Sequence, residues 1–552
     1  MRRTFLKSIL GVVVLTLSHH PDALAQQSGS AAGASNASPA PNTPTLPQAG
    51  AIAPVAPLSP EATALQLYRT GKFEAAADAY TKLAGTDPAL AYAGLARVYL
   101  KEKRVADAAA AAAKAIEAGP KSPDAHVAHA EVLFRQGKIP ESENELVEVV
   151  NSGQHSARAY LDLAEVDEAA SFYGRAKSMI EMAHRVDPSD PDIRREWLFT
   201  LPRAERLKEL KDYLAGETDD DAEDRADLMR ILTLLQDETA EPKRTCRQIT
   251  KVSSTETRLE PLLDDPQHLR GYGLTVNFNG TSAKLMLDTG AGGILVDRHV
   301  AQKAGIKPIV ETQIGGIGSK GESGGYLGYA DSIKIGDLEF HDCLVEVLDK
   351  RSVLDDDGLI GADVFAGYLV DLDLPDRKFR LSELPVAPTG TSGSAGLQAG
   401  GEDRNEWHDP FIAPEMKSFT PVFRFGHMLL VRTWLNNAPP KLFLLDTGAF
   451  DNMITPEAAR EVTKIRGDDS DVIKGLNGKV AKVYTADKVK IRFAHFSQER
   501  EDLLAFDLSN ISDGAGTEIS GTLGFAMLFV LDIKIDYRDG LVNFTYDKNR
   551  FH

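Results

Sequence analysis

The sequence predicts a multidomain protein in which an all-α helical repeat region precedes an all-β region made of two similar lobes. Three observations support this prediction. The chain has 552 residues, which is too long for one hydrophobic core. A helical pattern recurs about every 34 residues in its N-terminal part, and short alternating apolar runs with a duplicated four-residue motif occupy its C-terminal part.

The acidic composition excludes some classes of partner. The formal net charge is −19 and the pI is about 5.2. Binding to phosphates requires clustered Lys and Arg, so we expect no nucleic-acid partner. Beyond the first 25 residues no stretch resembles a transmembrane segment, and we expect no stable membrane insertion.

Residues 1–25 have the pattern of a signal peptide. A positive start, MRRTFLK, is followed by the short apolar run SILGVVVLTL and by the small-residue pattern Ala23-Leu24-Ala25. Arg2-Arg3 also fits a twin-arginine signal, and the residues leave both export routes open. The expected location is therefore periplasmic or secreted.

Residues 26–58 are rich in Pro, Ala and Ser, and we expect a disordered linker there. The helical pattern follows over residues 59–200, where RTGKFEAAADAY, KEKRVADAAAAA and RQGKIPESENEL recur after shifts of 32 and 34 residues. Gly71 and Gly137 stand at the expected helix turns. The pattern resembles tetratricopeptide repeats, which implies a solenoid whose concave face binds a protein partner or, alternatively, a stabilising scaffold. We expect residues 201–265 to form a helical connector.

The chain has two cysteines, Cys246 and Cys343, and no CxxC pattern. In an oxidising compartment they can form one disulfide; the alternative is two buried thiols. His126 and His129 are three residues apart in a predicted helix, and we interpret them as packing or surface residues. The sequence therefore predicts no metal site and no cofactor.

Two units with one layout follow the repeats. We expect the first lobe at residues 266–385, a flexible Gly/Ser linker at 386–415 and the second lobe at 416–552. An apolar run leads into Asp-Thr-Gly-Ala at Asp288 and again at Asp446, an offset of 446 − 288 = 158. At this offset Asp297 matches Thr455, and each stands where a helix N-cap is expected.

The duplicated motif resembles the aspartic proteases of the retropepsin and pepsin type. The apolar-apolar-Gly turns Leu359-Ile360-Gly361 and Leu523-Gly524 fit the same family, although Thr522 replaces an apolar residue in the second turn. The resemblance implies that each lobe supplies one catalytic aspartate to a common cleft. The residues implied for the site are the catalytic Asp288 and Asp446, the supporting Thr289, Gly290, Ala291, Thr447, Gly448 and Ala449, and the flap residues Gly316, Gly318, Tyr326 and Tyr329.

Two nearby carboxyls have a physical reason to act together. Two carboxyl groups about 3 Å apart cannot both be ionised, because their negative charges repel, so the pair shares one proton. One carboxylate can then activate a water while the other polarises a peptide carbonyl. The predicted activity is an aspartic endopeptidase acting on a peptide or protein substrate; the alternative is a non-catalytic peptide-binding scaffold. The sequence leaves open whether the lobes pair within one chain or between two.

Overall fold

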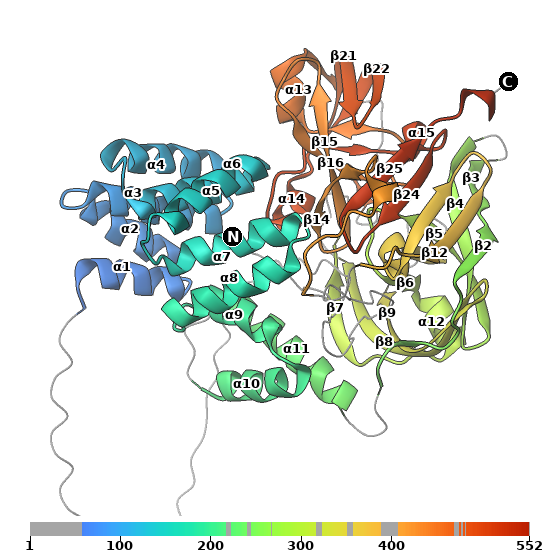
Figure 1. The fold of residues 1–552 in the computed structure, drawn as a ribbon, viewed down its shortest axis with the longest axis horizontal. Helices are drawn as coiled ribbons and strands as arrows, with labels where there is room; N and C mark the ends of the chain where they lie inside the picture. The colour runs from blue at the N-terminus through green and yellow to red at the C-terminus, as the bar shows by residue number, and fades with distance from the viewer. Residues whose placement is uncertain are drawn as a thin grey trace, which may run out of the picture.

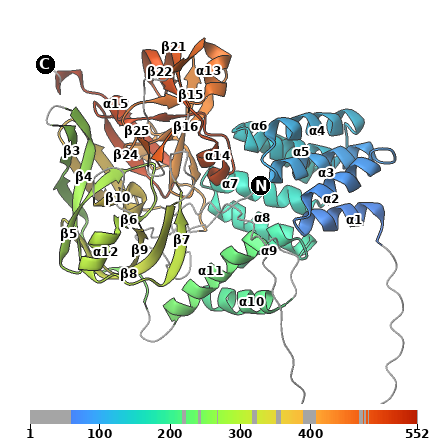
Figure 2. The same ribbon diagram turned by 180° about the vertical axis from the view of Figure 1, so that it is seen from behind.

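The computed structural model has a helical array on one side and a β-rich body on the other (Figures 1 and 2). The expected signal peptide at residues 1–25 lies outside the described residues, as do most of the two expected linkers. The structure describes residues 58–216, 222–239, 244–265, 268–315, 323–349, 357–387, 407–468, 474–475, 478–480 and 482–550.

The array consists of antiparallel helix pairs, as the repeats predict. Side chains of Ser59, Asp87, Ser122, Ser156 and Asp190 accept backbone N–H groups at the starts of the helices that they cap. The helices are α1 (Pro60–Arg69), α2 (Phe73–Leu83), α3 (Pro88–Lys101), α4 (Val105–Ala118), α5 (Pro123–Arg135), α6 (Ile139–Asn151), α7 (Ala157–Ala169), α8 (Tyr173–Val186), α9 (Pro191–Thr200), α10 (Arg203–Ala215) and α11 (Ala222–Thr239).

The turns inside these pairs repeat one backbone conformation. Gly71, Lys103, Gly137 and Ser171 all have a positive φ, between 61° and 74°. The left-handed conformation reverses the chain between paired helices, and glycine adopts it without strain. The two predicted turn glycines are therefore placed as expected.

The expected helical connector over residues 201–265 is wrong in its C-terminal part. Helix α11 ends at Thr239, and residues 247–265 form strands β1 (Arg247–Gln248), β2 (Ser254–Arg258) and β3 (Glu260–Asp265). Side chains of β2 alternate between exposed and half-buried, which is the period of a strand rather than of a helix. The first lobe therefore begins its sheets earlier than predicted.

The first lobe winds one large sheet around the Asp288 loop. Strand β10 lies between β5 and β6, parallel to β5 and antiparallel to β6. The further elements of this lobe are β4 (His268–Phe278), β5 (Thr281–Asp288), β6 (Ile294–Asp297), α12 (Arg298–Ala304), β7 (Val310–Ile314), β8 (Ser323–Ile335), β9 (Leu338–Leu348), β10 (Gly358–Gly361), η1 (Ala362–Phe365), β11 (Tyr368–Asp373) and β12 (Lys378–Glu383).

The second lobe repeats this layout around Asp446. Strand β23 lies between β16 and β17, parallel to β16 and antiparallel to β17. Its elements are η2 (Pro414–Met416), β13 (Thr420–Pro421), β14 (Phe423–Phe425), β15 (Met428–Leu435), β16 (Lys441–Leu445), β17 (Met453–Ile454), α13 (Pro456–Val462), β18 (Ile465–Asp468), β19 (Lys474–Gly475), β20 (Gly478–Lys479), β21 (Val483–Phe493), β22 (Phe496–Ala505), α14 (Ser509–Ala515), β23 (Gly521–Leu523), α15 (Phe525–Leu528), β24 (Asp532–Asp536), β25 (Leu541–Thr545) and η3 (Lys548–Arg550).

The predicted N-caps of the two matching helices are confirmed. Asp297 accepts the backbone N–H of Val300 at 2.8 Å, and Thr455 accepts that of Ala458 at 3.3 Å. Each cap follows the short strand that leaves the Asp-Thr-Gly-Ala loop. The equivalent caps fix the same chain direction after both loops.

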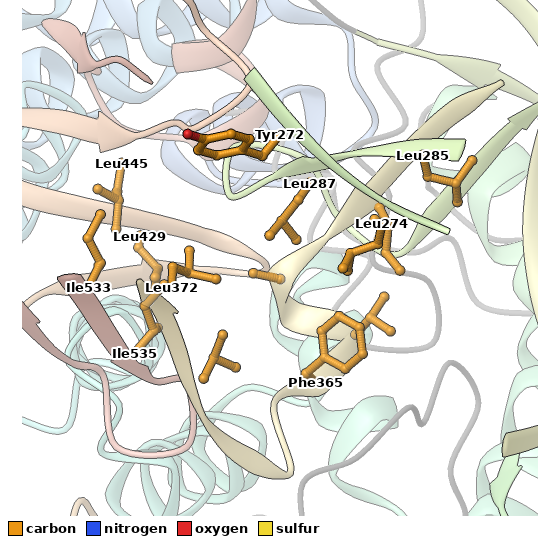
Figure 3. Packing of buried hydrophobic residues seen from close by; sticks show 14 of the residues in the cluster. Tyr272, Leu274, Leu285, Leu287, Phe365, Leu372, Leu429, Leu445, Ile533 and Ile535 are labelled. Carbon is orange, nitrogen blue, oxygen red and sulfur yellow. The ribbon is translucent and has the colours of Figure 1, made fainter. Parts of the chain in front are cut away.

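One sheet joins the lobes. Its strand order is β13-β25-β24-β11-β12-β2, and the antiparallel pair β11–β24 connects the first lobe to the second. Residues of both lobes also share one hydrophobic core. Figure 3 shows Leu285 and Leu287 of the first lobe and Leu429 and Leu445 of the second in this core.

The helical array packs against both lobes. Phe134 of α5 belongs to one buried cluster with Phe425 and Leu442 of the second lobe. Leu198 and Phe199 of α9 share another cluster with Leu327, Tyr329 and Leu344 of the first lobe. Apolar faces of the array are thus removed from water by the β-rich body.

The second linker is shorter than predicted, since residues 407–415 are packed. Gly174 of α8 donates its N–H to the carbonyl of His408, and the N–H of Arg175 donates to Asp409. In the structure Cys246 and Cys343 form a disulfide that ties the start of the β-rich body to β9. Among the described helices, none has the length and apolar character to cross a membrane.

Candidate active site

Equivalent strands deliver the two aspartates to one place. Asp288 ends β5 and lies opposite Gly361 in the parallel pairing with β10. Asp446 follows β16, and its N–H donates to the carbonyl of Leu523 at 3.1 Å. The predicted apolar-apolar-Gly turns therefore stand beside the two motif loops. Both aspartates come from a single chain.

The two threonines lock the loops together across the lobe boundary. The Thr289 hydroxyl donates to the carbonyl of Leu445 at 2.8 Å and accepts the N–H of Thr447 at 3.0 Å. The Thr447 hydroxyl donates to the carbonyl of Leu287 at 2.9 Å and accepts the N–H of Thr289 at 3.1 Å. Both side chains are buried, so these four reciprocal bonds are shielded from water.

The motif glycines let each loop reach the opposite aspartate. A Cβ on Gly290 would lie 2.8 Å from Cγ of Asp446, and one on Gly448 would lie 2.3 Å from Cγ of Asp288. Real Cβ atoms do not approach other carbons so closely. The site therefore requires glycine at both positions to bring the carboxyls together.

The two carboxyls form a hydrogen-bonded pair. Asp446 is buried and accepts the N–H groups of Gly448 and Ala449 at 3.0 and 2.8 Å. Asp288 accepts the N–H of Gly290 at 2.8 Å and also receives backbone hydrogen bonds from Ala291 and Gly448. A hydrogen bond between the carboxyl groups requires a proton on one of them.

The electrostatics of the pair also retain a proton. Burial, followed by the charge of Asp288, raises the pKa of Asp446 well above its ordinary value. Burial also raises the pKa of Asp288, against the opposing effect of its backbone hydrogen bonds. The pair therefore holds one proton over a pH range in which two free carboxylates would hold none. Such a pair can act as base and acid together.

One polar neighbour of the pair was not predicted from the sequence. His427 of the second lobe places Nε2 3.2 Å from the carbonyl oxygen of Gly290. It stands in the turn between β14 and β15, and 427 − 288 = 139 residues separate it from Asp288. The only sequence signal is the dipeptide Gly426-His427 between two apolar runs, which predicts a hairpin but no role for the imidazole.

Of the four expected flap residues, the structure describes the two tyrosines, and both are buried. Gly316 and Gly318 lie outside the described residues. Tyr326 is buried in the core of the first lobe, and its hydroxyl lies 3.4 Å from the carbonyl of Ile306. Tyr329 is buried beneath α9–α11. Neither tyrosine position supports the predicted contact with substrate, because residues of β8 alternate between two covered faces.

The helical array carries a second candidate site. A small depression of about 30 Å³ lies among residues of α1, α3, α5, α7 and α9, which are the first helices of successive pairs. Ion pairs such as Arg97–Glu131 and Arg158–Asp192 line it. Its lining residues are Tyr68, Arg97, Leu100, Glu131, Arg158, Leu161, Asp162, Glu165, Asp192, Arg195 and Glu196.

His126 and His129, which we interpreted as packing or surface residues, both contact one glutamate. Their Nδ1 atoms lie 2.7 and 2.6 Å from the two carboxylate oxygens of Glu145. In the part of the chain that the structure describes, no group of three or more His, Cys, Asp or Glu residues has a metal-binding arrangement.

Comparisons with known families match both regions. Residues 274–364 match the model of an aspartyl protease family, and residues 62–123 and 99–165 match two tetratricopeptide repeat models. Among solved structures, the aspartic proteinase from Irpex lacteus is similar, with 11% sequence identity and a TM-score of 0.33, over 54% of this chain and 98% of that one.

Curated relatives are similar over shorter stretches. UBA domain-containing protein Mud1 of Schizosaccharomyces pombe is 28% identical over 181 residues, which are 32% of this chain and 53% of the relative. DNA damage-inducible protein 1 of Cryptococcus neoformans is 27% identical over 142 residues, 23% of this chain and 32% of the relative. DNA damage-inducible protein 1 of Neurospora crassa is 26% identical over 164 residues, which are 28% of this chain and 36% of the relative. The chain spans about half or less of the length of these relatives.

Proposed function

We propose that this chain, which carries an aspartyl-protease domain and tetratricopeptide repeats, is an endopeptidase that hydrolyses peptide bonds with Asp288 and Asp446. One carboxylate removes a proton from a water molecule as it attacks the scissile carbonyl. The protonated partner donates to the carbonyl oxygen and stabilises the developing charge. As the C–N bond breaks, the leaving amine takes a proton from one carboxyl and a hydroxyl of the tetrahedral intermediate returns a proton to the other, which restores the single shared proton.

The observation that carries this proposal is the carboxyl pair itself. Two aspartates, 158 residues apart, share a hydrogen bond and are surrounded by backbone N–H donors from both lobes. A structural turn would need neither the reciprocal threonine bonds nor glycines at the point of contact. Burying two carboxyl groups beside each other costs free energy, and such costly, pKa-shifted pairs cluster at functional sites.

We further propose that the helical array recruits a protein partner or the substrate. Ion-paired cationic and anionic side chains surround the small depression on this face of the array, and helical repeats of this kind bind partners on one face. The array also packs directly on both lobes. A segment bound there would therefore be held near the protease domain.

We also propose that the chain is exported to the periplasm or secreted. The N-terminal signal pattern supports this location. The disulfide between Cys246 and Cys343 supports an oxidising compartment, because cytosolic reductants keep most thiols reduced.

The proposal predicts that Asp288→Asn and Asp446→Asn each lower kcat for peptide cleavage by at least about 100-fold. Either change removes a carboxylate or the proton that the pair shares. In the wild type, kcat should fall as pH rises and the pair loses this proton, because both raised pKa values favour the protonated form. Cleavage of a peptide library, followed by mass spectrometry over pH 3–8, measures both effects.

Asp507→Asn is a suitable control, because this exposed aspartate lies before α14 in the second lobe. The control should cleave like the wild type. Wild-type turnover in either dyad variant would contradict the joint mechanism. Binding of peptides without cleavage by the wild type would favour the non-catalytic scaffold.

A further inference from the structure

The two catalytic loops are held in different ways. In the second lobe, Phe525 donates its N–H to the carbonyl of Ala449, and Ala526 donates to that of Phe450, both at 2.7 Å. These bonds come from the same lobe. In the first lobe, Gly361 donates its N–H to the carbonyl of Gly293 at 2.8 Å, and the Gly290 carbonyl also bonds to His427 of the opposite lobe.

His427 differs in kind from the residue at its place in the first lobe. Gly273 pairs with Met286 as Leu430 pairs with Leu444, so the strand registers match the lobes here at an offset of 157 and place Arg270 at the position of His427. The two motifs therefore have the same four residues but different side chains at this neighbouring position.

The peptide between Gly290 and Ala291 connects His427 to the catalytic pair. A carbonyl only accepts, so Nε2 of His427 must carry the proton. The peptide is planar, with its C=O and N–H pointing in opposite directions. The carbonyl points to His427, and the N–H of Ala291 points to Asp288, where it donates to the backbone carbonyl at 3.3 Å and also supports the carboxylate. Holding the carbonyl therefore aims the N–H at the carboxylate.

The turn that carries His427 is seated on the helical array. Gly426 has φ of 62° in the two-residue turn between Phe425 and Met428. These two flanking residues belong to the buried cluster that includes Phe134 of α5. The rings of Phe425 and Phe134 have centroids 5.9 Å apart. The array thus fixes the position of the hairpin tip.

A charged neighbour braces the same hairpin. Arg424 donates from Nε to the carbonyl of Gly426 at 2.8 Å and from Nη1 to that of Tyr537 at 2.6 Å. Its guanidinium lies over the rings of Tyr537 in the second lobe and Tyr173 in α8. Burial lowers the pKa of His427 to about 4, so the imidazole is neutral near pH 6.

We propose that His427 is a positioning residue, seated by the helical array, which holds the Gly290–Ala291 peptide so that Ala291 stabilises ionised Asp288. The role rests on the proposed protease function for its kinetic consequences only. It gives the array a part in catalysis that is independent of any partner. If α5 moved against the hairpin, His427 would move with the hairpin and would shift the Gly290–Ala291 peptide beside Asp288.

The kinetic test compares His427→Leu with His427→Gln, whose amide can still donate to the Gly290 carbonyl. We expect kcat to fall about 10- to 100-fold in the Leu variant, with KM unchanged within twofold, and to recover in the Gln variant. The fall of kcat at low pH, which we call the acidic limb, should move to higher pH in the Leu variant. The reason is that the pKa of Asp288 rises when its ionised form loses a hydrogen bond. Asp446 is the titratable group that acts on Asp288, and Arg424 is the charged group that acts on His427; Asp288, Asp363 and Arg424 all act on the nearby Tyr537.

Phe134→Ala tests the seat, and Phe73→Ala, a similar change in α2 away from the hairpin, is its control. We expect the first variant to reproduce the kcat loss and the shifted acidic limb of His427→Leu and the second to leave both unchanged. Equal activity and equal acidic limbs of His427→Leu and wild type, or equal effects of the two Phe variants, would overturn the proposal.

A readout without catalysis separates this inference from the proposed function. Nitrogen-15 NMR of histidine-labelled protein, with His427→Gln used for assignment, reports which ring nitrogen carries the proton. We expect the Nε2–H tautomer in the wild type, and an Nδ1–H tautomer would overturn the inference. If the wild type cleaves no peptide, the protease function fails while this measurement still decides the role of the histidine.

Discussion

At the scale of single residues, the site depends on glycines, which have no side chain, as much as on the two aspartates. Gly448 sits where a Cβ would be 2.3 Å from Cγ of Asp288. The carboxylate cannot move away easily, because it accepts backbone N–H bonds and contacts Asp446. A single methyl group would therefore separate the two halves of the dyad.

We predict that Gly448→Ala lowers kcat/KM by at least about 100-fold, because a misplacement near 1 Å is sufficient for such a loss. Gly467→Ala is the matched control, since its added Cβ would meet nothing within 4 Å. Steady-state kinetics of both variants make the comparison. Normal activity of Gly448→Ala would mean that the two loops are not in contact in solution.

A second residue-scale prediction concerns Glu346, which lies on β9 and is only 5% exposed. Within the described residues its Oε1 has no hydrogen-bond partner. Burial raises its pKa well above the ordinary value. Above pH 4.3, the ordinary glutamate pKa, the unfolded chain releases this proton more readily than the folded one, so the wild type loses stability as pH rises.

Glu346→Gln should therefore raise the midpoint of thermal unfolding at pH 7.5 and leave it nearly unchanged at pH 4. Glu339→Gln is the opposite case, because a hydrogen bond from His341 lowers the pKa of this half-buried carboxyl. It should gain no stability at pH 7.5. Thermal scans at both pH values decide, and a lower midpoint for Glu346→Gln at pH 7.5 would show that the carboxylate has a partner.

At the scale of elements, strand pairing brings distant motifs into register. Strand β10 inserts between β5 and β6, which places Gly361 beside Asp288 although 73 residues separate them. Strands β11 and β24 then pair across the lobes. Side-chain alternation explains why Tyr326 and Tyr329 are covered, since one face of β8 meets the core of the first lobe and the other meets helices.

At the scale of the whole molecule, the helical array and the β-rich body share buried surface. Asp513 of α14 pairs with Arg135 of α5 and with Lys103, whose Nζ lies 2.7 Å from its Oδ2. Arg135 is buried, so its guanidinium depends on this carboxylate. Thr517 and Glu518 add hydrogen bonds to backbone carbonyls of α5 beside it.

Asp513→Ala should lower the free energy of unfolding by about 3 kcal/mol, because it leaves a buried guanidinium without its counter-charge. Asp107→Ala removes an exposed ion pair with Arg104 on α4 and should change stability little. Urea unfolding followed by circular dichroism compares them. Equal stabilities of the two variants would indicate that the array and the lobes do not pack together in solution.

Sequence patterns predicted the architecture well where local chemistry decides it. The repeat period, the turn glycines Gly71 and Gly137, and the caps Asp297 and Thr455 are consequences of short stretches of chain. The same reasoning placed the strands β2 and β3 in a helical connector; β2 pairs with β12, which is distant in sequence, although β3 pairs with its neighbour β4. It also predicted that Tyr326 and Tyr329 contact substrate, because the motif gives no sign of the core and the helices that cover them.

The sequence by itself determined that two equivalent loops exist and which side chains they carry, because an apolar run into Asp-Thr-Gly-Ala encodes its own strand and turn. Only the tertiary structure decided that the lobes meet within one chain, that Cys246 bonds Cys343, and that His427 touches Gly290. The physical reason is that hydrogen bonds and packing between distant segments depend on how whole sheets and helices dock. No short-range pattern records that docking.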